Sequence, residues 1–315
     1  PCPSGTYVNT TGSTAEADCQ PCSAGFSCPT TATVIPTVSC PAGLYCELGE
    51  IEPTKQCWLG HYCPEGMHVP QRCLPGTYQN ETGYSACDEC PQGYFCEEAT
   101  IQPVECPTGF YCPPATEFAT QFACANGTFN DRTRLTEASE CSSCLPGKYC
   151  ALRGMSEPSG NCSAGHFCLG GSVVPNPTHG FEHGYSGDII TIPTWEEPGD
   201  ICPKGHYCPV GSQSPTPCPT GTFSNATGLH AVEQCEDCTS GFYCPDMGIV
   251  LPTQPCSDGF YCPTGQSASA LPCTVGHYCD GGLVEPSKCY AGTYQNVTGQ
   301  GTCTVCPTRY YCPPA

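Results

Sequence analysis

Cysteine is the residue with the most chemical potential in this chain, and its spacing is compatible with two uses. The 315 residues include 34 cysteines. Five pairs have the Cys-x-x-Cys spacing of zinc modules, namely Cys19 with Cys22, Cys87 with Cys90, Cys141 with Cys144, Cys235 with Cys238 and Cys303 with Cys306. Such a cysteine share is also typical of a disulfide scaffold. Glycosylation sequons recur in one frame beside the cysteines, and sequons and disulfides both belong to the secretory route, so we predict disulfides and no metal site.

Six Asn-x-Ser/Thr sequons predict covalent N-glycans. Their asparagines are Asn9, Asn80, Asn126, Asn161, Asn225 and Asn296. Four of the six lie seven residues after the first cysteine of a repeat, whereas in the third repeat Asp131 holds that place and Asn126 lies five residues earlier. Asn161 belongs to Asn-Cys-Ser, whose central cysteine limits its use. We expect no other cofactor.

One stretch has the spacing of a catalytic zinc motif. His179-Gly-Phe-Glu182-His183 is a literal His-x-x-Glu-His. That motif works on a helix, where both imidazoles face the metal. Pro177 before it and glycine within it argue against a helix. We therefore expect no catalytic, cofactor-binding or metal-ligating residues, and no enzyme.

Four other histidines follow a turn glycine in the repeats: His61, His166, His206 and His277. Other repeats have Phe, Leu or Lys in that slot. The slot therefore requires bulk, and a ligand role is not predicted.

The charge balance excludes several partner classes. Nine basic residues stand against 29 acidic ones, for a formal net charge of −20, and the basic residues form no cluster. Nucleic acid, heparin and anionic lipid all need concentrated positive charge, so none is an expected partner. No run of 18 apolar residues occurs, so we expect no membrane insertion in this segment. Residue 1 already lies inside a repeat, which is expected of a mature chain or of a segment from a longer array.

Two kinds of repeat use every cysteine. Five four-cysteine modules of the form Cys-x(13 or 16)-Cys-x2-Cys-x5-Cys span residues 2–28, 73–96, 124–150, 218–244 and 289–312. Seven Cys-x5-Cys modules lie between them: Cys40 with Cys46, Cys57 with Cys63, Cys106 with Cys112, Cys162 with Cys168, Cys202 with Cys208, Cys256 with Cys262 and Cys273 with Cys279. The resulting blocks are 1–72, 73–123 with one small module missing, 124–217 with an insertion at about 169–201, 218–288, and a partial block 289–315.

The filling of the short loop predicts local structure. It reads Cys-x-x-Gly-x-aromatic-Cys, and only Ser27 and Arg309 depart from it. Glycine suits a tight turn with positive φ, and we expect the residues on either side of it to form a minimal hairpin. Pro and Gly interrupt every window, so no helix beyond a turn or two is expected. The predicted fold is small, disulfide-rich and mostly irregular with short β-ribbons, arranged as an elongated tandem-repeat rod.

The unit in residues 73–96, Cys-x-x-Gly-Thr-Tyr-x-Asn-x-Thr-Gly followed by Cys-x-x-Cys-x-x-Gly-Tyr-x-Cys, resembles a known repeat. It is similar to the ephrin-receptor-like (GCC-type) cysteine-rich repeat, itself similar to the cysteine-rich modules of tumour-necrosis-factor receptors. The resemblance covers the chain except about 169–201. Such repeats occur in tandem in large secreted or membrane-anchored proteins. The resemblance implies an elongated, non-catalytic extracellular spacer or fibre, and it fixes no single activity.

Disulfide connectivity stays open at this point. The small modules come and go two cysteines at a time, which favours internal pairing of each Cys-x5-Cys. Within a four-cysteine module, pairing first to second and third to fourth resembles one receptor module type, and first to third and second to fourth resembles another. An offset pairing, in which a cysteine of one module bonds a cysteine of the next, such as Cys46 to Cys57, is the third alternative. We prefer local pairing.

The insertion is the one irregular segment, and it combines Ile189, Ile190, Ile192 and Trp195 with two glutamates. A β-ribbon folded against its own block is favoured over a contact surface for another chain, because short Ile/Thr runs are ordinary strands.

The function predicted from these patterns is a structural extracellular glycoprotein of a surface filament, coat or matrix. The alternative is a ligand-binding or adhesion ectodomain of a receptor. Sequons at one repeat position favour the former, because their sugars would cover much of a binding face. We expect secretion to the cell surface or beyond, and self-association or other extracellular glycoproteins as partners.

Overall fold

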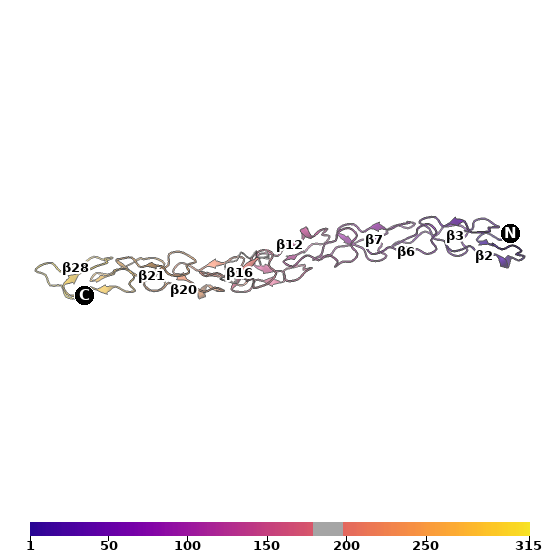
Figure 1. The fold of residues 1–315 in the computed structure, drawn as a ribbon. Helices are drawn as coiled ribbons and strands as arrows, with labels where there is room; N and C mark the ends of the chain where they lie inside the picture. Colours follow the sequence, from indigo (N-terminus) through magenta and orange to yellow (C-terminus); the bar gives the residue numbers. More distant parts are fainter. Residues whose placement is uncertain (179–197) are drawn as a thin grey trace, which may run out of the picture. The chain divides into compact units, whose positions relative to one another are not determined.

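The computed structural model describes residues 1–178 and 198–315. Its regular elements are very short: the described strands have two or three residues, and the described helices are the single 3-10 turns η1 (Glu16–Asp18), η2 (Ala138–Glu140) and η3 (Val232–Gln234). The chain divides into unit 1, Pro1–Ser142 with Arg153–Glu157, and unit 2, Ser143–Leu152 with Pro158–Ala315. Each unit has the predicted disulfide-rich fold, and Figure 1 shows its short β-ribbons.

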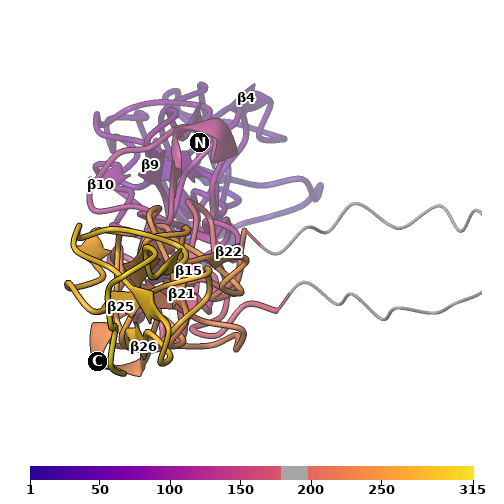
Figure 2. The same ribbon diagram turned by 90° about the vertical axis from the view of Figure 1, so that its left-hand side faces the viewer.

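Antiparallel two-stranded ribbons recur along each unit. In unit 1 the pairs are β1 (Thr6–Tyr7) with β2 (Gln20–Pro21), β3 (Phe26–Ser27) with β4 (Val38–Ser39), β5 (His61–Tyr62) with β6 (Gln71–Arg72), β7 (Thr77–Tyr78) with β8 (Asp88–Glu89), and β9 (Tyr94–Phe95) with β10 (Val104–Glu105). Next along the chain come β11 (Thr128–Phe129) and β12 (Ser142–Ser143). In unit 2 the pairs are β13 (Lys148–Tyr149) with β14 (Gly160–Asn161), β15 (His166–Cys168) with β16 (Gly199–Ile201), β17 (His206–Tyr207) with β18 (Thr216–Pro217), β19 (Thr222–Phe223) with β20 (Glu236–Asp237), β21 (Phe242–Tyr243) with β22 (Gln254–Pro255), β23 (Phe260–Tyr261) with β24 (Leu271–Pro272), β25 (His277–Tyr278) with β26 (Ser287–Lys288), and β27 (Thr293–Tyr294) with β28 (Thr304–Val305). Figure 2 shows β21 with β22 and β25 with β26 in the orange to yellow part.

Seventeen disulfides pair all the cysteines locally, and each closes one loop. The pairing expected inside the Cys-x5-Cys modules is confirmed for all seven. The disulfides are Cys40 with Cys46, Cys57 with Cys63, Cys106 with Cys112, Cys162 with Cys168, Cys202 with Cys208, Cys256 with Cys262, and Cys273 with Cys279. The offset disulfide pairing is therefore wrong, because Cys46 bonds Cys40, and Cys57 bonds Cys63.

The four-cysteine modules contain two such loops each. The first cysteine pairs with the second and the third with the fourth, as in Cys73–Cys87 and Cys90–Cys96. We number the loops as modules 1 to 17 in chain order. Modules 1, 5, 8, 12 and 16 are long, with cysteines 14 or 17 positions apart, and the other modules are short, with cysteines 6 apart.

Each module begins with a β-turn that ends just after the glycine. In module 2 the Phe26 amide donates to the Ser23 carbonyl at 3.1 Å, and Gly25 has φ 88°. A turn with positive φ at its third residue is a type II turn, which favours glycine there. Sixteen modules have glycine at this place, with φ from 71° to 88°, and Arg309 in module 17 has φ 78°.

The expected hairpin inside each short loop is wrong. The dipeptide after the glycine pairs with the dipeptide that leads into the next module, so that Phe26 faces Ser39 and not a residue of its own loop. The reason is that the turn uses the residues between the opening cysteine and the glycine, and no strand is left on that side to pair.

Within each unit, four backbone hydrogen bonds join a module to the next, and we call this pattern the ladder. The turn glycine donates to the closing cysteine of the next module and accepts from its opening cysteine. The opening cysteine accepts from a second turn in the next module, and the closing cysteine donates to that turn. Between modules 2 and 3 the bonds are Gly25 N to Cys46 O at 2.9 Å, Cys40 N to Gly25 O at 2.9 Å, Gly49 N to Cys22 O at 2.8 Å and Cys28 N to Glu50 O at 3.0 Å. The final step, from module 16 to module 17, has three of the four bonds.

The turn glycine also lies against the module after next. A Cβ added at Gly43 of module 3 would lie less than 3.0 Å from the carbonyl oxygen of Gly83 in module 5. The same approach recurs from Gly25 to Gly66 in unit 1 and from Gly241 to Gly282 in unit 2. Glycine is therefore required twice at this place, by its φ and by the lack of space.

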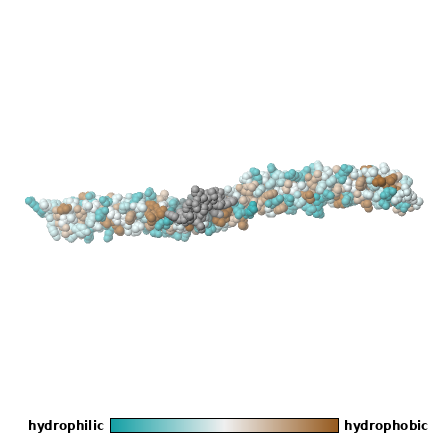
Figure 3. Space-filling model, in the orientation of Figure 1, coloured by the Kyte–Doolittle hydropathy of each residue, from teal (hydrophilic) through white to brown (hydrophobic). Residues whose placement is uncertain are grey.

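Disulfides form most of the buried material. Nearly every buried apolar residue is a cysteine, and Tyr45 is one of the few large side chains among them. Tyr45 packs on the disulfide of the next module, Cys57–Cys63, with Met67 beside it. On the face that Figure 3 shows, apolar residues are interspersed with hydrophilic ones. Cross-links thus replace an apolar core, as expected for so few large aliphatics.

Changing Gly43 and Gly292 to alanine separates the two demands on the turn glycine. Both have nearly the same φ, 86° and 84°, but nothing lies within 4 Å of a Cβ at Gly292. We expect Gly292→Ala to cost about 1 kcal/mol of local stability and Gly43→Ala about 3 kcal/mol, because only the latter adds a clash. Hydrogen exchange of the ladder amides in each variant measures both costs. Equal costs would contradict the close approach.

Candidate functional site: the loops of the long modules

The long modules hold the in-frame sequons, and a threonine fixes the start of each loop. The hydroxyl of Thr77 donates to the Leu74 carbonyl three residues earlier, at 2.7 Å. The threonine after the turn glycine does the same in the other long modules, as Thr6 with Pro3, Thr128 with Ala125, Thr222 with Pro219 and Thr293 with Tyr290. This bond holds the hydroxyl on its own turn, so the Gly-Thr pair of the sequence has a structural role.

A polar residue replaces the closing cysteine in the ladder of four long modules. In module 5 this is Gln79: Gly60 N donates to Gln79 O at 2.8 Å, and Gln79 N donates to Thr100 O at 3.1 Å. We call these residues anchors. They are Gln79, Asn130, Ser224 and Gln295, with exposed fractions of 1, 2, 2 and 9%. In module 1 the partly exposed Val8 takes this place.

The anchor side chains hold the loops from inside. Gln79 Nε2 donates to the Ala86 carbonyl at 3.1 Å, and Gln79 Oε1 accepts from the Glu81 amide at 3.0 Å. Gln295 repeats this with Thr302 and Val297, at 2.9 and 3.1 Å. Asn130 and Ser224 bond the residue two positions on. Because their polar atoms are bonded, these side chains can be buried.

Sequence reasoning missed the anchors. The available signal was position: Gln79 stands three residues after its turn glycine, where a short module has its closing cysteine. A polar residue in a cysteine slot indicates that the backbone keeps its place while the disulfide moves further along the chain.

All six sequon asparagines are exposed. Asn80, Asn225 and Asn296 directly follow an anchor, and Asn9 follows Val8, so each in-frame asparagine lies next to a residue of the ladder. Asn225 Oδ1 also accepts from Lys204 Nζ at 3.0 Å. The two out-of-frame sites differ in setting, because Asn126 lies in the turn of module 8 and Asn161 lies in β14, opposite Lys148.

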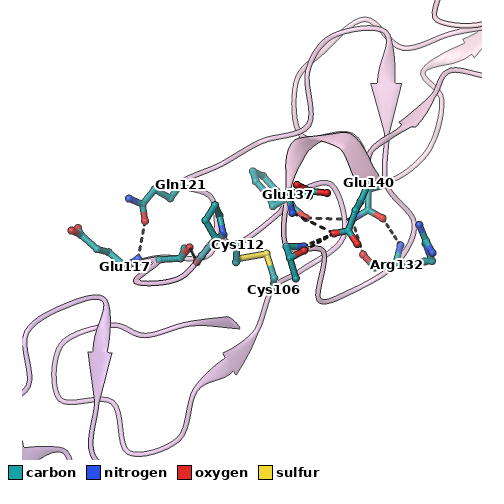
Figure 4. The surroundings of a disulfide bond; sticks show 12 residues. Cys106, Cys112, Glu117, Gln121, Arg132, Glu137 and Glu140 are labelled. Carbon is teal, nitrogen blue, oxygen red and sulfur yellow. Dashed lines mark hydrogen bonds between the residues drawn. A yellow bond between two sulfur atoms is a disulfide. The ribbon is translucent and has the colours of Figure 1, made fainter. Parts of the chain in front are cut away.

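A carboxylate or amide closes the far end of three loops. Glu140 Oε2 accepts from the amides of Thr136 at 2.6 Å and Glu137 at 3.3 Å. Figure 4 shows Glu140 and Glu137 near the Cys106–Cys112 disulfide. The two backbone amides hold the pKa of Glu140 below its usual value. Asp18 and Gln234 bond the equivalent amides in modules 1 and 12, so a charge is not required for this cap.

The predicted non-ligand histidines mostly bond their own turns. Nδ1 of His61, His206 and His277 lies 2.9, 3.0 and 3.1 Å from the carbonyl two residues earlier. His166 Nδ1 is buried without a hydrogen-bond partner in the described structure. Within residues 1–178 and 198–315, no three His, Cys, Asp or Glu side chains are grouped to hold a metal ion.

The remaining candidates lie outside the described residues. These are the His179–His183 motif and the insertion residues Ile189, Ile190, Ile192 and Trp195, for which the sequence favours a β-ribbon over a contact surface. The described flanks of the insertion meet in one ribbon, where Phe167 of β15 faces Asp200 of β16.

The anchor is tested by Gln79→Ala. Loss of the side chain leaves the Glu81 amide and the Ala86 carbonyl without a partner, so we expect the loop to lose about 1–3 kcal/mol of local stability. Hydrogen exchange of the Glu81 amide should speed up accordingly. Gln71→Ala, at an exposed position, is the matched control and should change nothing. An unchanged Glu81 amide would show that the anchor is dispensable.

Glu140 makes the loop of module 8 sensitive to pH. A lowered pKa means that folding favours the charged form, so this stabilisation is present above the ordinary carboxyl pKa and is lost as pH falls through the lowered value. We expect the exchange protection of the Thr136 and Glu137 amides to fall in acid. Glu140→Gln should keep the cap and remove the pH dependence, as the natural Gln234 loop does. A Gln234 loop with the same acid response would contradict this assignment.

Comparisons with known proteins add no family to these observations. No family model matches the chain, and no curated protein matches it. In the described residues, no helix is long and apolar enough to cross a bilayer.

Proposed function

We propose that this chain is a non-catalytic structural glycoprotein of the extracellular space. It acts as a disulfide-stapled spacer in a surface filament, coat or matrix. The observation that carries the proposal is the ladder: the turn glycines and cysteines direct their backbone groups into the neighbouring modules. A chain whose most invariant groups bind its own next repeat is suited to span distance and bear load.

Several features support an extracellular, glycan-bearing role. Seventeen disulfides and no free cysteine fit an oxidising compartment. The in-frame sequons lie on exposed loops that the anchors support from beneath. A net charge of −20 keeps such a chain soluble and disfavours polyanionic partners. Sugars at the long modules would shield the protein and leave the ladder untouched.

One observation favours the alternative of a ligand-binding or adhesion ectodomain. Trp58 lies in the turn of module 4 with 53% of its surface exposed, next to Leu59 at 40%. Its ring meets Tyr45 and His61 edge to face, at 5.9 and 5.6 Å between centroids. An exposed tryptophan in a fixed orientation is a typical binding anchor. The exposed Trp58 therefore makes recognition the second candidate.

Electron microscopy of the native secreted material tests the structural function. We expect continuous fibres or sheets with a repeat commensurate with the module blocks. Isolated particles that associate with a distinct ligand protein, and lose it on Trp58→Ala, would instead support the alternative. Peptide mapping after enzymatic deglycosylation provides the companion measurement, with Asn80, Asn225 and Asn296 expected to be occupied. Bare asparagines at all six sequons would remove the glycan part of the proposal.

A further inference from the structure

The disulfides of the long modules differ in exposure from those of the short ones. In every short module except module 17, both cysteines are at most 2% exposed. In the long modules the opening cysteine is buried, but the closing cysteine is partly exposed. These partly exposed residues are Cys19, Cys87, Cys141, Cys235 and Cys303.

The ladder explains this difference. We call each backbone hydrogen bond of the ladder a rung. In a short module the closing cysteine takes part in these rungs, so its backbone is fixed beneath the next module. In a long module the anchor or Val8 takes that rung, and the closing cysteine lies further along, at the far end of the loop. Within the described residues, none of the five closing cysteines bonds a neighbouring module through its backbone. Their disulfides therefore close a loop that reaches the ladder only through its second turn, as at Gly83 and Tyr84 in module 5.

We propose that the long-module disulfides are sites of thiol–disulfide exchange, with the closing cysteine as the sulfur that an external thiol attacks. In module 5 the incoming thiolate attacks Cys87 Sγ and the Cys73–Cys87 bond breaks. A mixed disulfide forms at Cys87, and the electron pair leaves on Cys73 Sγ, which takes a proton from water. One disulfide and one thiol are consumed and one of each is formed, so no oxidant or reductant is needed.

Access decides which sulfur reacts. Exchange needs the thiolate to reach one sulfur along the S–S axis, so a partly exposed cysteine is attacked before a buried one. Cys90 and Cys96 of the neighbouring short module are both 0% exposed, so attack there requires the module to open first. The long and short modules of one block thus provide reactive and protected disulfides side by side.

The ladder should survive the exchange at module 5. Cys73 keeps its two backbone rungs, from Cys73 N to Gly60 O and from Ala99 N to Cys73 O, both at 2.9 Å. Gln79 keeps the two backbone bonds that a closing cysteine makes in a short module. The sequon loop beyond Gln79 loses its covalent closure, and its second turn then depends on the backbone bonds from Gly83 N to Cys57 O and from Cys63 N to Tyr84 O. The exchange therefore couples a thiol-bearing molecule to the array, by a cysteine of the loop that carries Asn80, while the rungs at Cys73 and Gln79 are kept.

Reduced glutathione is the probe for this site. The intact protein is incubated with increasing glutathione, quenched with acid, alkylated and peptide-mapped, and the dose is raised until module 17 reacts. Module 17 is the internal reference because Cys306 and Cys312 are both partly exposed. We expect glutathione on the five closing cysteines and alkylation of their opening partners, with the other short modules at least tenfold less modified. Reaction of the short modules at the same dose, or module 17 alone, would overturn the proposal.

A pair of double variants tests the survival of the ladder. Cys73→Ser with Cys87→Ser should leave the exchange protection of the Gly76 and Gln79 amides within about twofold of the unchanged protein. Cys90→Ser with Cys96→Ser, in the adjacent short module, should lose protection at Gly93 and in both neighbouring modules. Equal loss in the two variants would show that the long-module disulfide is part of the ladder, and would overturn the proposal.

Discussion

The close approach of most turn glycines to the module after next is the constraint on which the rest of the structure depends. A Cβ at Gly43 or Gly241 would lie closer than 3.0 Å to a carbonyl oxygen two modules away. With the glycine in place, its amide and carbonyl reach the two cysteine positions of the next module. The disulfide then needs only to hold those two positions together. A chain with few large aliphatics can therefore be ordered by backbone bonds and sulfur.

The same constraint explains how the array accepts long loops. The ladder uses only the backbone N–H and C=O at the closing position. A residue other than cysteine can therefore make the same bonds there. Gln79 and Cys96 thus occupy equivalent rungs. What changes is the cost of burying the side chain, which Gln79 meets by bonding its own loop. Variation is thereby confined to the loop beyond the rung, where Asn80 is exposed.

Much of the fold and of the candidate loops follows from spacing, but contacts between modules do not. The Cys40–Cys46 spacing and the central Gly43 indicate a short disulfide loop with a positive-φ turn, and the structure contains both. Nothing local to Gly43 records its approach to Gly83, 40 positions away, and the expected hairpin was wrong because its partner strand precedes the next module. In-frame sequons mark the long loops, but an anchor such as Gln79 looks like ordinary loop material until the modules are stacked. The β-ribbon and the contact surface considered for Ile189, Ile190, Ile192 and Trp195 stay predictions, because these residues lie outside the described part of the chain.

The contacts between alternate modules also show what changes at the block with a missing module, residues 73–123. Within unit 1, contacts between a module and the one after next link modules 1, 3, 5 and 7 in one series and 2, 4, 6 and 8 in another, as Gly93 with Arg134 shows for modules 6 and 8. A block of four modules returns each long loop to the same series, as from module 1 to module 5. The block of three places module 8 in the other series, and there Asp131 replaces the in-frame asparagine. Removal of one module therefore changes the series to which a long module belongs, while the four backbone bonds between modules 7 and 8 are kept.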